Sequence, residues 1–367
     1  MMAQALTPLP DAAWNPEADD RLTCLAAFPE THDTKTFVFR APEGRRFVFE
    51  PGQFLTFGFE IAGETVNRCY SLASSPLRPG TASITVKRVP GGVVSEWLHA
   101  TMRPGATVRA LGPMGAFTAA RHPAPKYLFL SGGSGITPLM SMSRAFADLA
   151  APVDIVFLHA ARSPLDLVFR AELDLIARRL DGFRVVHLPE RRDGEAGWSG
   201  AVGRISAPLL RYLVPDAAER TVFCCGPDPF MAAAKGICSE LGVPASNHHQ
   251  ESFDLSTLQE EEPAAAVQAA VAGQETEATP QTFTVAFARS DREVQVGADQ
   301  FVLPAARECG VTMPSACRTG LCGTCKSKLI SGTVDMQHRG GIRQREIDAS
   351  LFLPCCSKPL SDLVVDR

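Results

Sequence analysis

The chain has 367 residues, a net charge of −4, 45% apolar residues and 21% charged residues. This length predicts two or three domains with separate cores, and the charge excludes the basic surface that nucleic-acid-binding proteins use. No run of 18 apolar residues occurs, and residues 1–20 lack the basic and apolar segments of a secretory signal. The sequence therefore predicts a cytoplasmic protein without a membrane or nucleic-acid partner.

After the N-terminal extension (residues 1–20), residues 21–122 alternate short β-prone runs with Gly and Pro turns. This texture predicts a closed antiparallel β-barrel. The clearest candidate strands are 36–40, 53–59 and 82–88.

Residues 123–253 alternate strand-like and helix-like segments, which predicts βαβ units and a parallel sheet. Candidate strands are 127–130, 153–158, 184–187 and 221–224. The first of them runs into Gly132, Gly133 and Gly135, and a helix over 139–149 follows. A glycine-rich turn at a helix N-terminus can bind phosphate, although taken alone it fits an ordinary tight turn equally well. It lacks the lysine of a P-loop and the last glycine of a nucleophile elbow.

Residues 254–281 contain acidic residues and many alanines but no Lys or Arg, which predicts a flexible acidic linker. Residues 282–367 then form a further domain, with strands over 282–287 and 292–296 and a helix over 301–309.

Four cysteines of this last domain have the spacing C-x4-C-x2-C followed by a distant fourth: Cys317, Cys322, Cys325 and Cys355. The spacing is typical of plant-type [2Fe–2S] clusters. Zinc is an alternative, but its sites usually have two close pairs, and disulfides would suit a small secreted domain. Cys356, next to Cys355, is a second candidate for the fourth ligand.

Taken together, residues 21–253 resemble the ferredoxin–NADP reductase superfamily, and residues 282–367 resemble a fused plant-type ferredoxin. The segment Arg68–Leu72 is similar to the R-x-Y-S flavin motif of that superfamily. The resemblance implies that Arg68 binds the flavin pyrophosphate, that Tyr70 packs on the isoalloxazine and that Ser71 lies near its N5.

The segment Gly91–Ser95 resembles the second flavin-phosphate turn, in which Ser95 would cap a helix. This turn favours FAD, although related reductases use FMN. Val86 and Lys87 match the strand beside the cofactor. The resemblance thus adds further cofactor-binding residues: Leu72, Val86, Lys87, Gly92, Val93, Val94 and Ser95.

The glycine turn matches the nicotinamide-nucleotide loop, with Gly132, Gly133, Gly135, Thr137 and Pro138 as binding residues. Cys225, Gly226 and Pro227 match a Cys-Gly-Pro turn whose cysteine approaches the nicotinamide, so the resemblance makes Cys225 and Ser71 catalytic. The alternative for Cys225 is a small buried apolar side chain.

Glu251 and Phe253 match the stretch that brings an acid and an aromatic ring to the flavin. The preceding His248 and His249 are expected in a loop. Arg162 and Ser163 could meet a 2′-phosphate or only solvent, so NADH is favoured over NADPH without being decided.

The ferredoxin resemblance implies a β-grasp domain. It also selects Cys355 over Cys356, because Pro359 lies four residues after Cys355 as in the family pattern. Arg339, Arg343 and Arg345 form a basic group that either meets an acidic partner or is simply a solvated face.

The carriers imply a direction of electron flow. NAD(P)H delivers two electrons together, a [2Fe–2S] cluster accepts one, and a flavin can link the two. Transfer from a plant-type to a Rieske cluster is downhill by at least about 6 kcal/mol, which makes a Rieske oxygenase a feasible acceptor.

This module order resembles the reductases of Rieske-type oxygenases. Residues 248–253 and the acidic linker resemble most the reductases of glycine betaine and related quaternary-amine demethylating monooxygenases. Alternatives are a hybrid-cluster protein reductase and the reductase of an aromatic-ring hydroxylating dioxygenase. A redox sensor without turnover and a self-sufficient oxygenase are two further hypotheses. The complete cofactor motifs argue against the first, and the lack of an evident haem-ligand or 2-His-1-carboxylate segment argues against the second.

Overall fold

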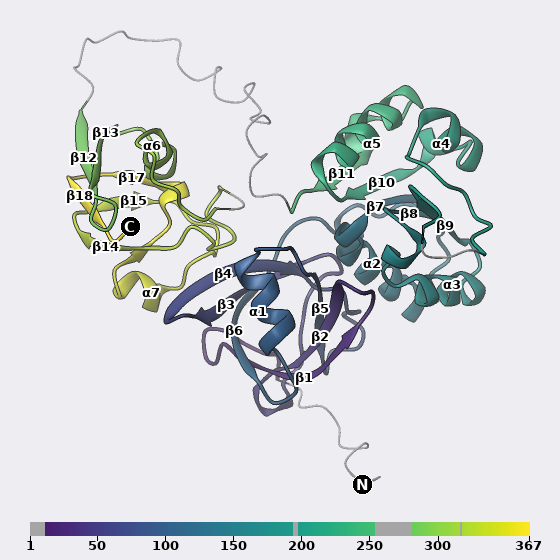
Figure 1. Cartoon of the computed structure of the whole chain (residues 1–367), viewed down its shortest axis with the longest axis horizontal. Helices are drawn as coiled ribbons and strands as arrows, with labels where there is room; N and C mark the ends of the chain where they lie inside the picture. The colour runs from purple at the N-terminus through teal and green to yellow at the C-terminus, as the bar shows by residue number, and fades with distance from the viewer. Residues whose placement is uncertain (1–11, 194–196, 254–280, 316–317) are drawn as a thin grey trace. The chain divides into compact units, whose positions relative to one another are not determined.

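The computed structural model describes residues 12–193, 197–253, 281–315 and 318–367. Its contacts divide the chain into two compact units, residues 1–253 and residues 254–367, which are described separately (Figure 1). The predicted linker 254–281 lies outside the described residues except for Gln281, so its flexibility stays a prediction, as do the other domain boundaries. Within the described ranges, no helix is long and apolar enough to span a membrane.

Among the described residues of the first unit, six strands form an antiparallel sheet in the order β4-β3-β6-β1-β2-β5. A bridge between Leu72 and Ile84 joins its two edges, which confirms the predicted barrel. The strands are β1 (Arg21–Pro29), β2 (Thr34–Arg40), β3 (Phe54–Ile61), β4 (Glu64–Ser71), β5 (Ala82–Lys87) and β6 (Thr107–Met114).

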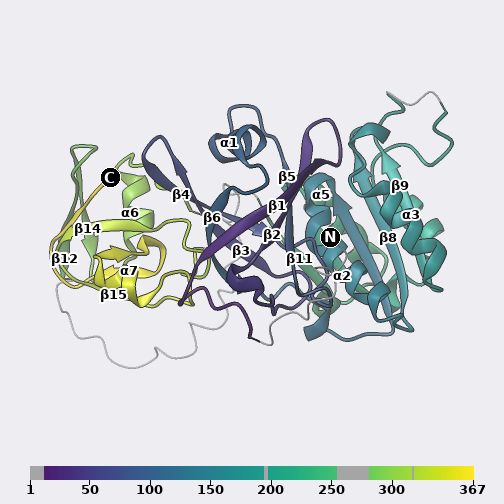
Figure 2. The ribbon, with the colours of Figure 1, turned by 90° about the horizontal axis from the view of Figure 1, so that it is seen from below.

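Alternation along the strands builds the barrel core. Phe37 and Phe39 on β2 and Phe57 and Phe59 on β3 are two residues apart, so both pairs point to the same side of their strands and are buried. Helix α1 (Val93–Thr101) packs against the barrel in Figure 1 and Figure 2 and buries Val94 and Leu98 in the same core.

The second half of this unit is a parallel sheet with strand order β11-β10-β7-β8-β9, which confirms the predicted βαβ arrangement. Helices α2 and α3 cover one face and α4 and α5 the other (Figure 1). The elements are β7 (Lys126–Gly132), α2 (Ile136–Asp148), β8 (Asp154–Ala161), α3 (Arg170–Arg179), β9 (Phe183–Pro189), α4 (Ala207–Leu213), β10 (Thr221–Cys225), α5 (Asp228–Glu240) and β11 (His248–Glu251). In such sheets ligands bind beyond the carboxyl ends of the strands, where the glycine turn and Cys225 lie.

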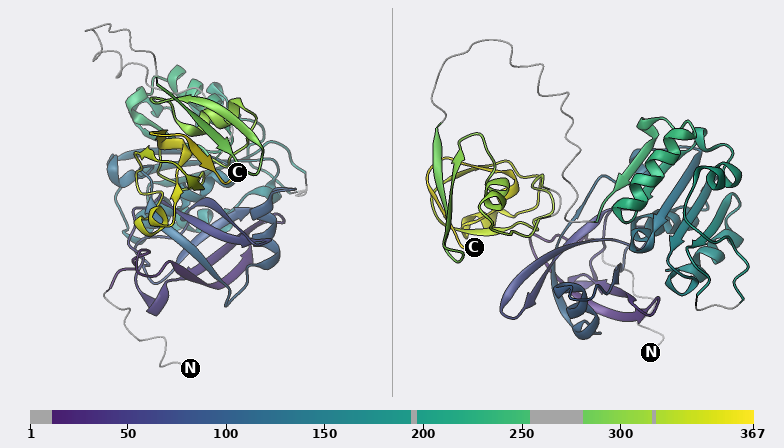
Figure 3. Two further views of the ribbon diagram at one scale, coloured as in Figure 1. Left: turned by 90° about the vertical axis from the view of Figure 1, so that its left-hand side faces the viewer. Right: turned by 45° about the horizontal axis from the view of Figure 1, so that its top comes forward.

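Among the described residues, the C-terminal unit contains a mixed sheet with strand order β13-β12-β18-β14-β16, in which the first and last strands of the unit, β12 and β18, pair in parallel. Helix α6 packs its apolar side onto this sheet, which confirms the predicted β-grasp domain (Figure 3). The elements are β12 (Thr282–Phe287), β13 (Arg292–Gly297), α6 (Val302–Glu308), β14 (Ser327–Ser331), β15 (Val334–Met336), α7 (Gln344–Asp348), β16 (Leu351–Phe352), β17 (Ser357–Pro359) and β18 (Leu363–Val365).

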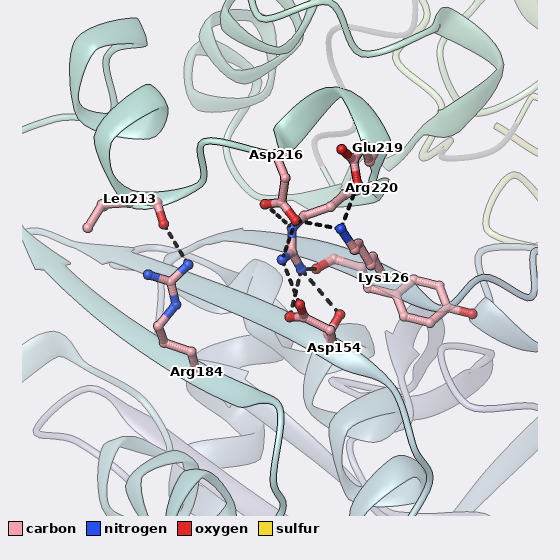
Figure 4. A network of polar contacts seen from close by, with 8 residues as sticks. Lys126, Asp154, Arg184, Leu213, Asp216, Glu219 and Arg220 are labelled. Atoms are coloured by element: carbon pink, nitrogen blue, oxygen red, sulfur yellow. Dashed lines mark hydrogen bonds and ion pairs between the residues drawn. The ribbon is translucent and has the colours of Figure 1, made fainter.

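A network of charged side chains stabilises the end of the parallel sheet opposite the glycine turn (Figure 4). Arg220, only 3% exposed, donates two hydrogen bonds to Asp154 and two to Asp216, all 2.9 Å long. Lys126 also contacts Asp216, at 3.0 Å. The Arg220 guanidinium in particular lowers the pKa of Asp216 to about 2.

We expect Arg220→Met to destabilise the protein by about 2–3 kcal/mol, because it leaves two partly buried carboxylates without their shared cation. A thermal melt should show a melting temperature several degrees below that of the wild type. Arg211→Met is the matched control, since Arg211 forms an exposed ion pair with Glu240 that should contribute about 0.5 kcal/mol or less. Equal effects of the two substitutions would show that the network adds no stability.

Candidate functional site

The R-x-Y-S motif occupies the end of β4. Ser71 is 5% exposed and Tyr70 is half-buried, with its ring 6.1 Å from that of Phe57. Arg68 donates from Nη1 to its neighbour's carbonyl oxygen at 2.8 Å. Leu72 packs into the barrel core, so only its backbone is available to a ligand.

The turn before α1 depends on glycine. Gly91 has φ +74°, and a Cβ at Gly92 would lie 2.6 Å from Ser95 Oγ. The prediction that Ser95 caps α1 is wrong: Gly92 is the N-cap, and Ser95, the third helical residue, accepts a hydrogen bond from the N–H of Val89 at 3.1 Å.

Two backbone groups of this turn suit a phosphate. Val93 and Val94 are the first two residues of α1, and the N–H groups of a first helical turn have no partner inside the helix. The side chain of Val94 is buried in the core, so any contact that it makes with a diphosphate must come from its backbone.

The neighbouring strand β5 contributes mainly structure. Val86 is 3% exposed, and its carbonyl oxygen accepts a hydrogen bond from His99 Nε2 at 2.8 Å, which ties β5 to α1. The Lys87 ammonium pairs with Asp33 at 3.2 Å. Any contact of Val86 with a cofactor must therefore come from its backbone. Lys87 would contact a cofactor with an ammonium group that already forms an ion pair with Asp33.

The glycine turn after β7 touches the turn after β10. A Cβ at Gly135 would lie 2.3 Å from the carbonyl oxygen of Cys225, and one at Gly226 would lie 3.0 Å from the backbone of Gly132. Gly133 has φ +53° and open space beside it. The two turns pack so closely that no side chain fits at Gly135, and of these glycines only Gly133 has open space beside it. The two turns, which form a cradle at the N-terminus of α2, therefore offer a nucleotide phosphate the backbone around Gly133.

The first turns of two helices border this cradle. Thr137 and Pro138 are buried at the start of α2, where Thr137 donates from Oγ1 to the carbonyl oxygen of Ser134 at 3.3 Å. Pro227 is the N-cap of α5. Both helix N-termini begin at the carboxyl ends of neighbouring strands, where their dipoles favour an anion.

The structure brings Ser71, Cys225 and Glu251 together. Cys225 and Glu251 are register partners on β10 and β11, and the Ser71 hydroxyl hydrogen-bonds the Glu251 carboxyl group. Burial raises the pKa of Glu251 to about 8, and its Oε2 is buried without a partner among the described residues. Burial likewise raises the pKa of the Cys225 thiol. An uncharged thiol and a carboxyl group that can exchange a proton near neutral pH thus lie in one site.

The end of this segment departs from the sequence prediction. His248 and His249 lie in strand β11 and not in a loop, and the His249 ring stacks on that of His122 with centroids 3.8 Å apart. Phe253, two residues beyond β11, is 40% exposed. Strand β11 has only four residues, all of them polar, so no alternation of apolar and polar residues indicated this edge strand.

The predicted cluster ligands gather in the C-terminal unit, except that Cys317 lies outside the described residues. Cys322, Cys325 and Cys355 are 3%, 2% and 5% exposed, and the sulfur atoms of Cys325 and Cys355 are in hydrogen-bonding contact. A buried group of thiols from two distant segments is the donor set that a [2Fe–2S] cluster requires.

Two glycines let the cysteine loop fold tightly. Gly320 and Gly323 have φ of 72° and 69°, and a Cβ at Gly323 would lie 2.3 Å from the carbonyl oxygen of Gly341. A Cβ at Gly320 would lie 2.6 Å from Cys356 Sγ. The Cys356 thiol donates to the carbonyl oxygen of Leu353 at 3.6 Å and also contacts Cys355, whose sulfur contacts that of Cys325 as well.

The predicted basic group does not form one exposed face. Arg343 is 5% exposed and caps α7, where its N–H donates to Glu346 at 2.9 Å. Glu346 also pairs with Lys326 at 2.7 Å. Both alternatives for this group, an acidic partner or a solvated face, are therefore wrong for Arg343, because this residue is buried within its unit.

Three family descriptions match the chain in succession. Residues 26–119 match the oxidoreductase FAD-binding domain, residues 129–236 the oxidoreductase NAD-binding domain and residues 285–360 the 2Fe-2S iron-sulfur cluster binding domain. The three matches cover the barrel, the parallel sheet and the β-grasp unit in turn.

Full-length relatives share this order. The chain is 39% identical to the glycine betaine monooxygenase reductase subunit of Pseudomonas aeruginosa, with 100% of each chain covered. It is 36% identical to the stachydrine N-demethylase reductase subunit of Rhizobium meliloti, with 94% and 96% covered.

Among solved structures, phthalate dioxygenase reductase has a TM-score of 0.56 at 24% identity, covers 96% of this chain and is itself covered over its whole length, which shows the shared fold. The protein is thus an NAD(P)H-dependent oxidoreductase with FAD-binding, NAD-binding and [2Fe–2S] domains. It belongs to the family of flavin and iron–sulfur reductases that contains the glycine betaine monooxygenase reductase subunits.

Proposed function

We propose that this protein delivers electrons to the Rieske-type oxygenase of a quaternary-amine N-demethylating system, with glycine betaine as the first candidate substrate. The observation that carries this proposal is the end-to-end similarity to glycine betaine monooxygenase reductase subunits, at 39% identity. The similarity to a stachydrine N-demethylase reductase subunit supports the wider class, because stachydrine is also a quaternary amine.

Residues 21–122 would form the flavin domain. A bound FAD would accept two electrons from NAD(P)H and release them one at a time. Arg68 and the first N–H groups of α1 would bind its diphosphate, and Tyr70 would pack on its ring. Ser71 and Glu251 would hold the proton that is released there, since their side chains are hydrogen-bonded to each other.

Residues 123–253 would bind the nucleotide. The cradle at Gly132–Gly135 suits its phosphates, while Thr137 and Pro138 fix the start of α2 behind it. Cys225 would border the nicotinamide, where a small uncharged side chain permits close approach. We favour NADH as the electron donor and the cytoplasm as the location.

Residues 282–367 would hold the cluster through Cys317, Cys322, Cys325 and Cys355, joined to the nucleotide domain by the linker 254–281. The contact between Cys325 and Cys355 supports this ligand set. The linker would keep the cluster at high effective concentration near the flavin without a permanent interface.

Reconstitution tests the proposed function. With O2 present, the purified protein, NADH and a candidate Rieske oxygenase should convert glycine betaine to dimethylglycine, formaldehyde and water, with one NADH and one O2 consumed for each formaldehyde formed. NADPH in place of NADH tests the nucleotide preference. Parallel reactions with stachydrine and its oxygenase distinguish the two substrates. Reduction of cytochrome c by NADH without turnover in any oxygenase mixture would refute the proposed acceptor but leave the reductase class intact.

A further inference from the structure

Helix α2 contacts the segment after the flavin motif through one row of polar side chains. Ser141, Arg144 and Asp148 are three and four residues apart, so they lie on one face of the helix. Each reaches the segment Ala73–Arg78, which follows Ser71 closely. Since α2 begins at the nucleotide turn, this helix physically connects the two halves of the candidate site.

The segment after Ser71 is held from both sides. The Ala73 N–H donates to the carbonyl oxygen of Ser83 in the barrel at 2.8 Å, and the Ala73 carbonyl oxygen accepts from Arg144 Nη1 at 2.6 Å. The Ser74 carbonyl oxygen accepts from Ser141 Oγ at 2.7 Å. Ala73 is fully buried, so its carbonyl depends on Arg144 for a partner.

Arg144 itself is fixed by a third element. Its Nε and Nη2 donate to the Glu172 carboxylate on α3 at 2.8 and 2.6 Å, and its guanidinium lies 4.8 Å from the centroid of the Phe169 ring. Phe169 precedes α3 with φ 57°, a conformation that a bulky residue rarely adopts. The Arg144 side chain is only 13% exposed. Its guanidinium therefore joins the barrel, α2 and α3 in one rigid arrangement.

The neighbouring pair Arg78–Asp148 provides a contrast at the same junction. These side chains form a close bidentate contact, in which the Arg78 side chain is 66% exposed and that of Asp148 is 17% exposed. Exposed ion pairs contribute little, because solvent and salt screen them. The two contacts thus differ in the exposure of the arginine, which is buried in the Arg144–Glu172 pair and exposed in the Arg78–Asp148 pair.

We propose that Arg144 is a positioning residue that sets the distance between the Ser71 strand end and the nicotinamide cradle. The inference rests on the proposed function, in which electrons pass from a nucleotide at Gly132–Gly135 to a flavin at Ser71. Without Arg144, the carbonyl of Ala73 and the carboxylate of Glu172 lose their shared donor, and the strand end can shift. A displacement of about 1 Å between reacting groups can lower a rate about 100-fold.

The experiment compares Arg144→Met, Arg144→Lys and Asp148→Asn in the full-length holoprotein. Anaerobic rapid mixing with NADH gives the limiting rate of flavin bleaching and the NADH concentration at half that rate. Amide hydrogen exchange of the peptide covering residues 72–78 reports its mobility without turnover.

For Arg144→Met we expect a limiting rate about 10- to 100-fold lower, a half-saturating NADH concentration within about threefold of wild type, and faster exchange at residues 72–78. The limiting rate of Arg144→Lys should lie between those of wild type and Arg144→Met, because lysine keeps the charge but lacks the planar set of donors of a guanidinium. Asp148→Asn should stay within about twofold in both measurements.

The positioning role would be overturned if Arg144→Met kept the wild-type limiting rate, or if its rate fell while hydrogen exchange at residues 72–78 stayed unchanged. A fall in rate that only matches a loss of bound flavin would overturn it as well. If Arg144→Met does not fold, the limiting rates and the hydrogen exchange of Arg144→Lys and Asp148→Asn are compared instead. Equal values in these two variants would overturn the positioning role. If NAD(P)H does not reduce the flavin of the wild-type protein, the proposed function is refuted, and this inference with it.

Discussion

Replacing Cys355 with serine is expected to abolish electron delivery to cytochrome c while leaving NADH oxidation by ferricyanide within about twofold of wild type. Cys355 is the proposed ligand whose sulfur contacts that of Cys325, and a [2Fe–2S] cluster needs four thiolates. Ferricyanide can accept electrons from a flavin directly, so this activity reports an intact barrel and nucleotide domain. Visible absorbance and iron content should both fall to the level of a flavin-only protein.

Cys356→Ser is the matched control. Cys356 is equally buried and lies next in the chain, and its thiol donates to the carbonyl oxygen of Leu353 and contacts Cys355, but the ferredoxin resemblance selects Cys355 as the ligand. We expect this variant to retain its iron and at least half of its cytochrome c reduction. If Cys356→Ser loses the cluster and Cys355→Ser keeps it, the ligand assignment must be exchanged. Retention of iron in both variants would refute the four-cysteine site.

Glu251→Gln is expected to lower the rate of electron release to a one-electron acceptor about 100-fold, within the range usual for loss of a proton-transfer group. The pKa of Glu251 is raised to about 8 by burial. A group that must accept a proton works in its ionised form, so the wild-type rate should rise as the pH increases through about 8. Single-turnover reoxidation measured from pH 6 to pH 10 should lose this rise in the variant.

The same pKa predicts a stability effect of definite sign. The ordinary pKa of a glutamate is 4.5, so between pH 4.5 and about 8 the unfolded chain releases a proton that the folded protein keeps. Wild-type stability should therefore fall across this range, by on the order of a few kcal/mol, and Glu251→Gln should remove the fall. Glu240→Gln, at an exposed helical carboxylate, is the control for both measurements. Unchanged pH profiles in Glu251→Gln would exclude Glu251 as the proton-holding group.

The sequence predicted the long strands well because their cores have strong local patterns. The alternation around Phe37 and Phe39 indicates a barrel strand, and the apolar run around Phe129 indicates a buried parallel strand. The edge strand β11 was missed, because its pairing with β10 and not hydrophobic alternation makes it a strand. The exposure of Arg343 was mispredicted for a related reason: its charge suggests solvent, whereas the folded unit leaves it only 5% exposed.

By itself, the sequence determined the order of the three modules and the residue types of their sites, because cysteine spacing, glycine turns and the R-x-Y-S motif are fixed by local chemistry. Only the tertiary structure decided which distant groups meet. Ser71, Cys225 and Glu251 come together because β4 ends beside the carboxyl edge of the parallel sheet, where β10 and β11 end in register. Arg144 gave no motif, since its role depends on three elements that converge around one guanidinium.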